Sequence, residues 1–239
     1  PAMELKPQEL LVLFKVAAHP QRTWTYAELG ESLHLSTGEA HASVKRAKIA
    51  GLATATEGNR WTPVRSALLE FAVHGARYAF PAIVGPVKRG VPTSYGTAPL
   101  SALINSSADS LPVWPHPQGS VRGPSLSPIY RTAPQAALAD PVLHEWLALL
   151  DALRAGRARE RELARKLLGE RLSFDLTDED GHLRRFVGRV AGDRMEGSVY
   201  DFTNNGARQP FSARRLGAAP PFDGAGPAPE HEAESLGTE

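Results

Sequence analysis

The chain has 239 residues, a formal net charge of +1 and no cysteine. Without cysteine there is no disulfide framework, thiolate zinc site or cysteine nucleophile, and a reducing cytoplasm is the expected compartment. No apolar run approaches the roughly 18–20 residues of a membrane-spanning helix, and the N-terminus lacks the pattern of a signal peptide. We therefore expect a cytoplasmic protein with no membrane partner.

The charges are distributed unevenly along the chain. Residues 1–95 carry 11 basic and 7 acidic side chains, whereas residues 217–239 carry five acidic side chains and no basic one. The net charge of +1 is small only because the acidic residues 217–239 offset the basic rest of the chain. It therefore does not exclude a nucleic-acid partner. The acidic tail has little to bury and is predicted to be disordered. It could compete with DNA for the basic part of the chain.

Two helices are predicted near the N-terminus. The first begins at Pro7, ends before Pro20 and is strongly apolar. The second spans residues 26–33, and Thr25 with Glu28 forms a capping box at its start. Its apolar residues recur at helical spacing and so lie on one face.

A third helix follows after three residues. Ser36 and Glu39 form a second capping box, and the helix runs to Ala50 before Gly51. One side of it is apolar and the other is polar and basic. Two short helices joined by a tight turn, the second with a basic face, are typical of a helix-turn-helix. Residues 52–62 then have the pattern of a β-hairpin.

This order of elements over residues 5–62 resembles the bacterial winged helix-turn-helix regulators, of the broad MarR-like type. The resemblance is carried by Trp24-Thr25-Tyr26-Ala27-Glu28-Leu29-Gly30, Ser36-Thr37-Gly38-Glu39-Ala40, Val44-Lys45-Arg46-Ala47 and Gly51-Leu52. It implies a recognition helix at 37–50, a wing at 52–62, and a homodimer that binds palindromic double-stranded DNA to regulate transcription. The rest of the chain inherits nothing from it.

The candidate DNA-binding residues are Thr37, Gly38, His41, Ala42, Lys45, Arg46, Lys48 and Arg60. The first four lie in the half of the recognition helix that meets base edges in the major groove. The next three are predicted to contact phosphates, and the last lies beside the wing turn, within reach of a flanking minor groove or phosphate. Glu39 is expected to cap the helix and not to contact a base. Because winged domains also bind proteins, an antitoxin-like or adaptor module with a protein partner is the alternative.

The middle of the chain is rich in proline. Residues 64–80 are predicted to form one more helix, either as a dimer interface or as part of the domain core. Eleven of the 20 prolines then lie between Pro81 and Pro141, which argues against a long helix or a central strand. We expect an extended arm packed on a neighbour, with a disordered connector as the alternative.

The C-terminal half is predicted to contain helices and a small sheet. A helix beginning at residue 140 or 141 and broken by Gly156 is apolar on nearly every side, so it needs a cover from this chain or from a second copy. Residues 157–172 form a charged helix with a solvated face, or else a second nucleic-acid surface. Residues 173–216 show short strands separated by turns. Residues 188–197 resemble terminal strand pairs of some bacterial methyltransferases, but no cofactor-binding unit accompanies them.

The predicted fold class is α+β with an appended antiparallel β segment. Its parts are a winged helix-turn-helix domain with the following helix (3–80), a proline-rich arm (81–140), a helical dimerisation or packing segment (141–172), a small β meander (173–216) and a disordered acidic tail (217–239). The histidines lack metal-ligand spacing, residues 178–181 lack a full calcium pattern, and the glycines of 188–197 form no phosphate loop. We expect no metal, no cofactor and no catalysis.

Overall fold

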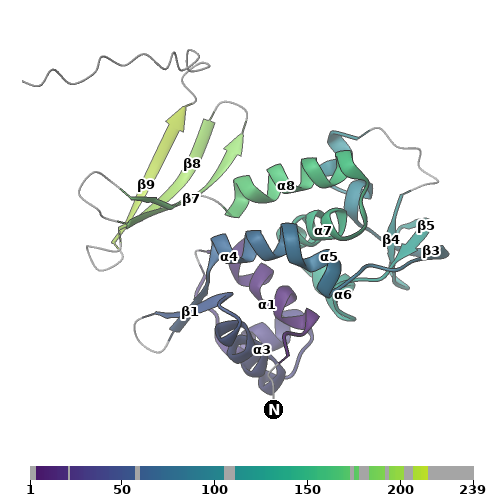
Figure 1. The fold of residues 1–239 in the computed structure, drawn as a ribbon, viewed down its shortest axis with the longest axis horizontal. Coiled ribbons are helices and arrows are strands. Elements are labelled where there is room, and N and C mark those ends of the chain that lie inside the picture. The colour runs from purple at the N-terminus through teal and green to yellow at the C-terminus, as the bar shows by residue number, and fades with distance from the viewer. Residues whose placement is uncertain are drawn as a thin grey trace, which may run out of the picture.

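The computed structural model is a mixed α+β protein in which small sheets flank a helical body (Figure 1). It describes residues 4–20, 22–56, 60–104 and 111–172, together with the backbone of 175–177, 183–191, 194–201 and 207–214. The predicted acidic tail at 217–239 lies outside the described residues. Within the described ranges, no helix is both long enough and apolar enough to cross a bilayer.

The N-terminal part consists of three helices and a hairpin. These are α1 (Pro7–Ala18), α2 (Tyr26–Leu33), α3 (Thr37–Ile49), β1 (Ala53–Thr56) and β2 (Arg60–Pro63). The side chain of Thr25 accepts a hydrogen bond from the Glu28 N–H at 3.2 Å, and Ser36 accepts one from the Glu39 N–H at 3.1 Å. In turn, the backbone N–H of each N-cap residue donates a hydrogen bond to the carboxylate of the glutamate. Both predicted capping boxes are confirmed.

The turn between α2 and α3 is close because residue 30 is a glycine. A Cβ atom on Gly30 would lie 2.8 Å from the carbonyl oxygen of Leu35. His34 ends α2 with a left-handed φ of 55°, and the Leu35 N–H donates to the Gly30 carbonyl at 2.8 Å. These contacts let α3 begin almost at once and hold it against α2.

The predicted helix at 64–80 is present and has an irregular middle. It consists of α4 (Arg65–Glu70), the π-helical segment η1 (Phe71–Gly75) and α5 (Ala76–Ala79). Its buried residues include Leu68, Ala72 and Ala76, and α4 packs on α8 while α5 packs on α7. Arg65 donates to the carbonyl oxygens of Arg171 at 2.8 Å and Leu172 at 3.3 Å. The apolar face of this helix therefore serves the core of its own chain.

The proline-rich segment contains a small closed sheet, which corrects the sequence prediction. Its elements are β3 (Val84–Pro92), η2 (Ser94–Gly96), η3 (Leu100–Ala102), β4 (Val113–Pro115), β5 (Val121–Leu126) and α6 (Ala133–Ala139). The prediction of no central strand is wrong, because β3 pairs with both β4 and β5. Pro92 and Pro115 end their strands, and the register shifts around Pro86. Proline is tolerated at such positions because no ladder hydrogen bond is needed there.

The helix α7 (Pro141–Ala155) lies at the centre of the molecule and is followed by α8 (Ala158–Leu172). It packs against α1, α5, α6 and α8 of its own chain (Figure 1). The proline-rich segment packs on it as well. Trp114 Nε1 donates to the Asp151 carboxylate at 2.5 Å, and Thr93 Oγ1 donates to it at 2.9 Å. The apolar surface predicted for α7 is thus covered within the chain, and the arm is packed and not a free connector.

The final strands form a separate antiparallel sheet in the order β6 (Asp175–Thr177), β7 (Leu183–Ala191), β8 (Arg194–Asp201) and β9 (Ala207–Arg214). The predicted meander is confirmed as four consecutively paired strands. In Figure 1 this sheet stands to one side of the helices, next to the end of α8.

Candidate nucleic-acid interface

The helix α3 presents one face away from the core, and this face is polar or small-sided apart from the exposed Ile49. Its buried residues are Ala40, Ser43, Val44 and Ala47. Thr37, Gly38, His41 and Lys45 are exposed, and Ala42 and Lys48 are partly exposed. At about 100° per residue, these six positions fall within an arc of about 140° that avoids the buried stripe. The structure therefore brings six of the candidate residues together on one face.

Arg46 is not on this face, and its predicted phosphate contact is corrected. Its Nη2 atom lies 2.6 Å from Glu9 Oε1, and its Nε atom donates to the same oxygen at 3.1 Å. The Glu9 side chain is 0% exposed and that of Arg46 is 13% exposed. The other Glu9 oxygen accepts from the Lys6 backbone N–H. Arg46 is thus the counter-ion of a buried carboxylate and ties α3 to α1. No helical periodicity could show this, because the partner lies on another helix.

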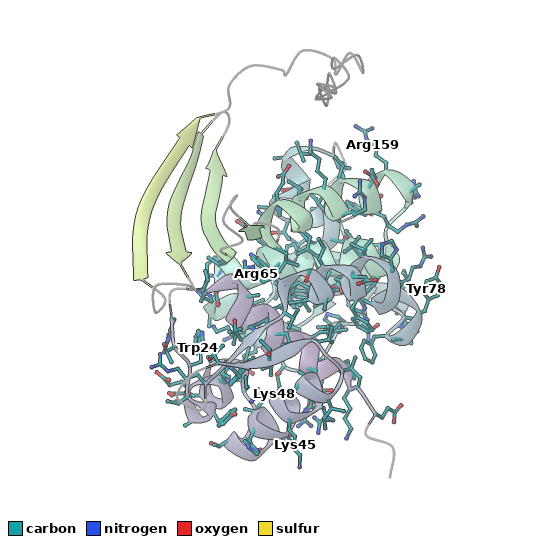
Figure 2. The ribbon with its side chains drawn as sticks, turned by 60° about the vertical axis from the view of Figure 1, so that its left-hand side comes forward. Trp24, Lys45, Lys48, Arg65, Tyr78 and Arg159 are labelled. Atoms are coloured by element: carbon teal, nitrogen blue, oxygen red, sulfur yellow. The ribbon has the colours of Figure 1, made fainter. Side chains whose placement is uncertain are left out.

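Lys45 and Lys48 are the available cations of the α3 face. Within the described part of the chain, neither ammonium group makes an ion pair or a hydrogen bond. Figure 2 shows both side chains at the lower end of the molecule, far from Arg159 at the opposite end. Two uncompensated lysines on one helix face form a local basic surface that attracts anions.

His41 is held in place by an aromatic neighbour. Its ring packs edge to face on Tyr26, with the centroids 4.9 Å apart and an interplanar angle of 87°. Tyr26 belongs to α2, so the contact joins the two helices on the exposed side of the turn. A ring that is held in place and exposed is suited to contact a base or a phosphate. Sequence reasoning did not identify the supporting role of Tyr26.

The start of α3 is held by polar contacts on both sides. Gln8 Nε2 donates to Ser43 Oγ at 2.8 Å, and Ser43 Oγ donates to the Glu39 carbonyl at 2.8 Å. Hydrogen bonds from the Ser36 backbone N–H and hydroxyl lower the pKa of Glu39, with a further contribution from the nearby Arg131 cation. Glu39 therefore caps the helix, as predicted. Arg131 was missed, since nothing in the sequence connects it with α3.

The hairpin is attached rigidly to the end of α3. The Leu52 N–H donates to the Ala47 carbonyl at 2.9 Å, and the Val64 N–H donates to the Leu52 carbonyl at 2.9 Å. Arg60 is the first residue of β2, is exposed and pairs in register with Thr56. The turn predicted at residues 57–59 lies outside the described residues. The predicted Arg60 contact thus starts from a fixed position next to α3.

A second polar cluster joins α1 to α7 and is structural in character. The Asp140 carboxylate accepts from Lys15 Nζ at 2.7 Å, lies 2.6 Å from His19 Nε2 and caps α7 through the Leu143 N–H at 3.0 Å. Burial acts to raise the pKa of Asp140, but the hydrogen bonds from His19 and Lys15 outweigh it and hold the pKa well below its usual range. The Trp24 ring lies against this cluster: His19 packs on it edge to face, with the centroids 6.0 Å apart, and Lys15 and Arg22 approach it.

The described residues contain little that suggests other chemistry. No group of three or more histidine, aspartate or glutamate side chains among them is placed to hold a metal ion. A cavity of about 200 Å³ lies beside β5 and the start of α8, lined in part by Tyr95, Arg157 and Glu160. Burial raises the pKa of the Tyr95 hydroxyl, and the Glu160 carboxylate adds to this. No histidine lines this cavity, and it is remote in the fold from the α3 face.

Comparisons with known proteins give no relative. No protein-family model matches the chain, and neither does any curated protein or any solved structure. The function must therefore be inferred from the geometry of the chain itself.

Proposed function

We propose that the protein is a DNA-binding transcriptional regulator, in which residues 7–63 form a winged helix-turn-helix. In this proposal α3 is the recognition helix and the hairpin of β1 and β2 is the wing. The observation that supports it best is the exposed α3 face, where two uncompensated lysines lie beside small and polar residues. The major groove of B-DNA admits one helix of this kind.

The side chains of the face suit the two kinds of contact that a recognition helix makes. Thr37 and His41 offer hydrogen-bonding groups to base edges, while Gly38 and Ala42 allow close approach, and the Ala42 methyl group suits a thymine methyl. Lys45, Lys48 and Arg60 contact phosphates, which gives affinity and salt dependence but little sequence preference. Arg46 is left out of this set because it neutralises Glu9.

The proposal includes a cytoplasmic homodimer that binds two half-sites of a palindrome. Because α7 is covered within its own chain, the second copy needs another surface. Four large apolar side chains are exposed on α5, on β3 and on the segment that joins them: Tyr78 at 76%, Ile83 at 72%, Val84 at 66% and Val87 at 58%. Tyr78 projects outward in Figure 2. We assign the dimer contact to these four residues, and call them the apolar strip.

The same apolar strip also favours the second candidate function, a protein-interaction module of the antitoxin or adaptor kind. Exposed apolar patches often mark binding sites for other proteins. The helix α7 does not add to the support for this candidate, because its apolar surface is covered within its own chain. If the purified chain is a dimer by light scattering and the double variant Tyr78→Ser with Val87→Ser is a monomer, the result favours the regulator. A wild-type chain that is monomeric by light scattering and binds no DNA favours the module.

The DNA-binding proposal is tested by fluorescence anisotropy of the full chain with a mixed-sequence duplex at two salt concentrations. Lys45→Gln with Lys48→Gln removes two phosphate contacts and is expected to weaken binding about 10-fold or more at low salt. The matched control is Arg159→Gln with Lys166→Gln, which removes the same charge from the exposed face of α8. Equal affinity of the two variants, or binding that ignores salt, contradicts the proposal.

A further inference from the structure

The strands β3 and β5 carry a pair of arginines that face each other. Arg89 pairs in register with Arg122, and both side chains are exposed. Directly opposite residues of an antiparallel pair have their Cβ atoms about 4.5–5.5 Å apart, and like charges at this position destabilise the sheet. Lys88 is exposed on the same strand. The two arginines on this β3–β5 ribbon therefore do not stabilise the sheet that carries them.

The chain does not neutralise this pair within its described part. Neither Arg89 nor Arg122 makes an ion pair there, in contrast to Arg154 and Arg165, which pair with nearby carboxylates. From residue 81 to residue 126 the sequence contains only one acidic residue, Asp109. An uncompensated arginine pair on an exposed ribbon is a site for a polyanion, because planar guanidinium groups bind phosphate oxygens in pairs.

The position of the ribbon connects it with the α3 face. The segment after β5 leads to Arg131, which lies close enough to Glu39 in the first turn of α3 to act on its carboxylate, and the adjoining α6 packs on α2. Arg131 follows Arg122 by nine residues, which span at most about 30 Å when fully extended. One turn of B-DNA covers about 34 Å. The chain distance from Arg131, near the start of α3, to Arg122 on the ribbon is therefore shorter than one turn of duplex.

We propose that the Arg89–Arg122 pair on the β3–β5 ribbon binds the phosphate backbone of the DNA duplex that occupies the α3 face. This inference rests on the proposed function and extends its interface. The ribbon contributes affinity and orientation, since phosphate contacts carry no sequence information by themselves. The β3–β5 unit then serves as a second arm of the interface in addition to the hairpin, and Arg131 lies near the start of α3.

The test compares salt titrations of the full chain bound to a duplex of about 30 base pairs, or three helical turns. Arg89→Gln with Arg122→Gln is expected to reduce the slope of log K against log salt by about 1.8, at about 0.9 for each lost phosphate contact. Its thermal stability should equal or exceed that of the wild type, because a like-charge pair is removed. The control Arg159→Gln with Lys166→Gln should leave the slope unchanged.

The outcomes separate this inference from the proposal on which it rests. An unchanged slope in the ribbon variant overturns the inference, while loss of affinity in Lys45→Gln with Lys48→Gln still supports the DNA-binding function. If the wild type binds no duplex, both fail. If the ribbon variant keeps its slope on DNA but loses association with anionic lipid vesicles, the site is a membrane contact and the inference is overturned.

Discussion

The ion pair between Glu9 and Arg46 gives the most quantitative prediction about the stability of the DNA-binding part. The variant Arg46→Met keeps most of the side-chain stem and removes the charge. It leaves a Glu9 carboxylate that is 0% exposed with the Lys6 N–H as its remaining donor. Breaking a buried ion pair from one side costs about 3–5 kcal/mol. We expect a loss near the lower end, since one backbone hydrogen bond remains.

The matched control is Lys48→Met on the same helix. Lys48 makes no ion pair among the described residues, and a surface substitution of this kind changes stability by about 0.5 kcal/mol or less. Thermal unfolding measures both variants, and a loss of about 3 kcal/mol lowers the Tm of a domain of this size by roughly 6–12 °C. The double variant Glu9→Gln with Arg46→Met removes both charges and should recover to within about 1.5 kcal/mol of the wild type.

Two results would refute this reasoning. One is a Tm of Arg46→Met equal to that of Lys48→Met, which means that Glu9 is not an isolated buried charge in the variant. The other is a double variant as unstable as Arg46→Met alone. The same pair explains why Arg46 is a poor target for testing DNA binding: its removal affects the fold of α1 and α3 before it affects any phosphate contact.

Further predictions concern the α2–α3 turn and the Asp140 cluster. Gly30→Ala should destabilise the protein by about 1–3 kcal/mol through overpacking, because the added Cβ would lie 2.8 Å from the Leu35 carbonyl oxygen. As a control, Gly169→Ala should stabilise α8 by about 0.5–1 kcal/mol, because the nearest atom to its added Cβ is 4.0 Å away. Chemical denaturation that finds Gly30→Ala more stable than Gly169→Ala would contradict the close packing of the α2–α3 turn. The lowered pKa of Asp140 means that its contribution is present above the unfolded-state pKa of about 3.9 and is lost as the pH falls below it. Denaturation at pH 6 and pH 3 should therefore show a smaller acid-induced loss in Asp140→Asn than in the wild type, and equal losses would assign acid sensitivity to other groups.

Local signals in the sequence predicted the N-terminal elements well. The capping boxes at Thr25 and Ser36 are hydrogen bonds between residues three apart, so the sequence alone contains both partners. The exposed arc of α3 also followed from helical periodicity. Arg46 was assigned to the wrong environment because its position at the edge of the apolar stripe was compatible with solvent or with a buried partner, and only packing against α1 decides between them.

The proline-rich segment shows the opposite case. Proline content argued against a central strand, but the prolines of β3 and β4 lie at strand ends and at a register shift, where they do no harm. Trp114 and Thr93 reach an aspartate on α7 that is distant in sequence. Pairings of this kind depend on tertiary contacts, and no pattern within the segment could have revealed them.

The central claim, that the α3 face contacts DNA, can be tested by cross-linking, because the chain has no cysteine. His41→Cys and Arg159→Cys each give a single thiol for a photoactivatable cross-linker, the first on the α3 face and the second at the opposite end of the molecule (Figure 2). On irradiation with bound duplex, the account predicts a protein–DNA adduct from position 41 and little or none from position 159. An adduct that forms as well from position 159, or that is absent from position 41 while DNA remains bound, would contradict it.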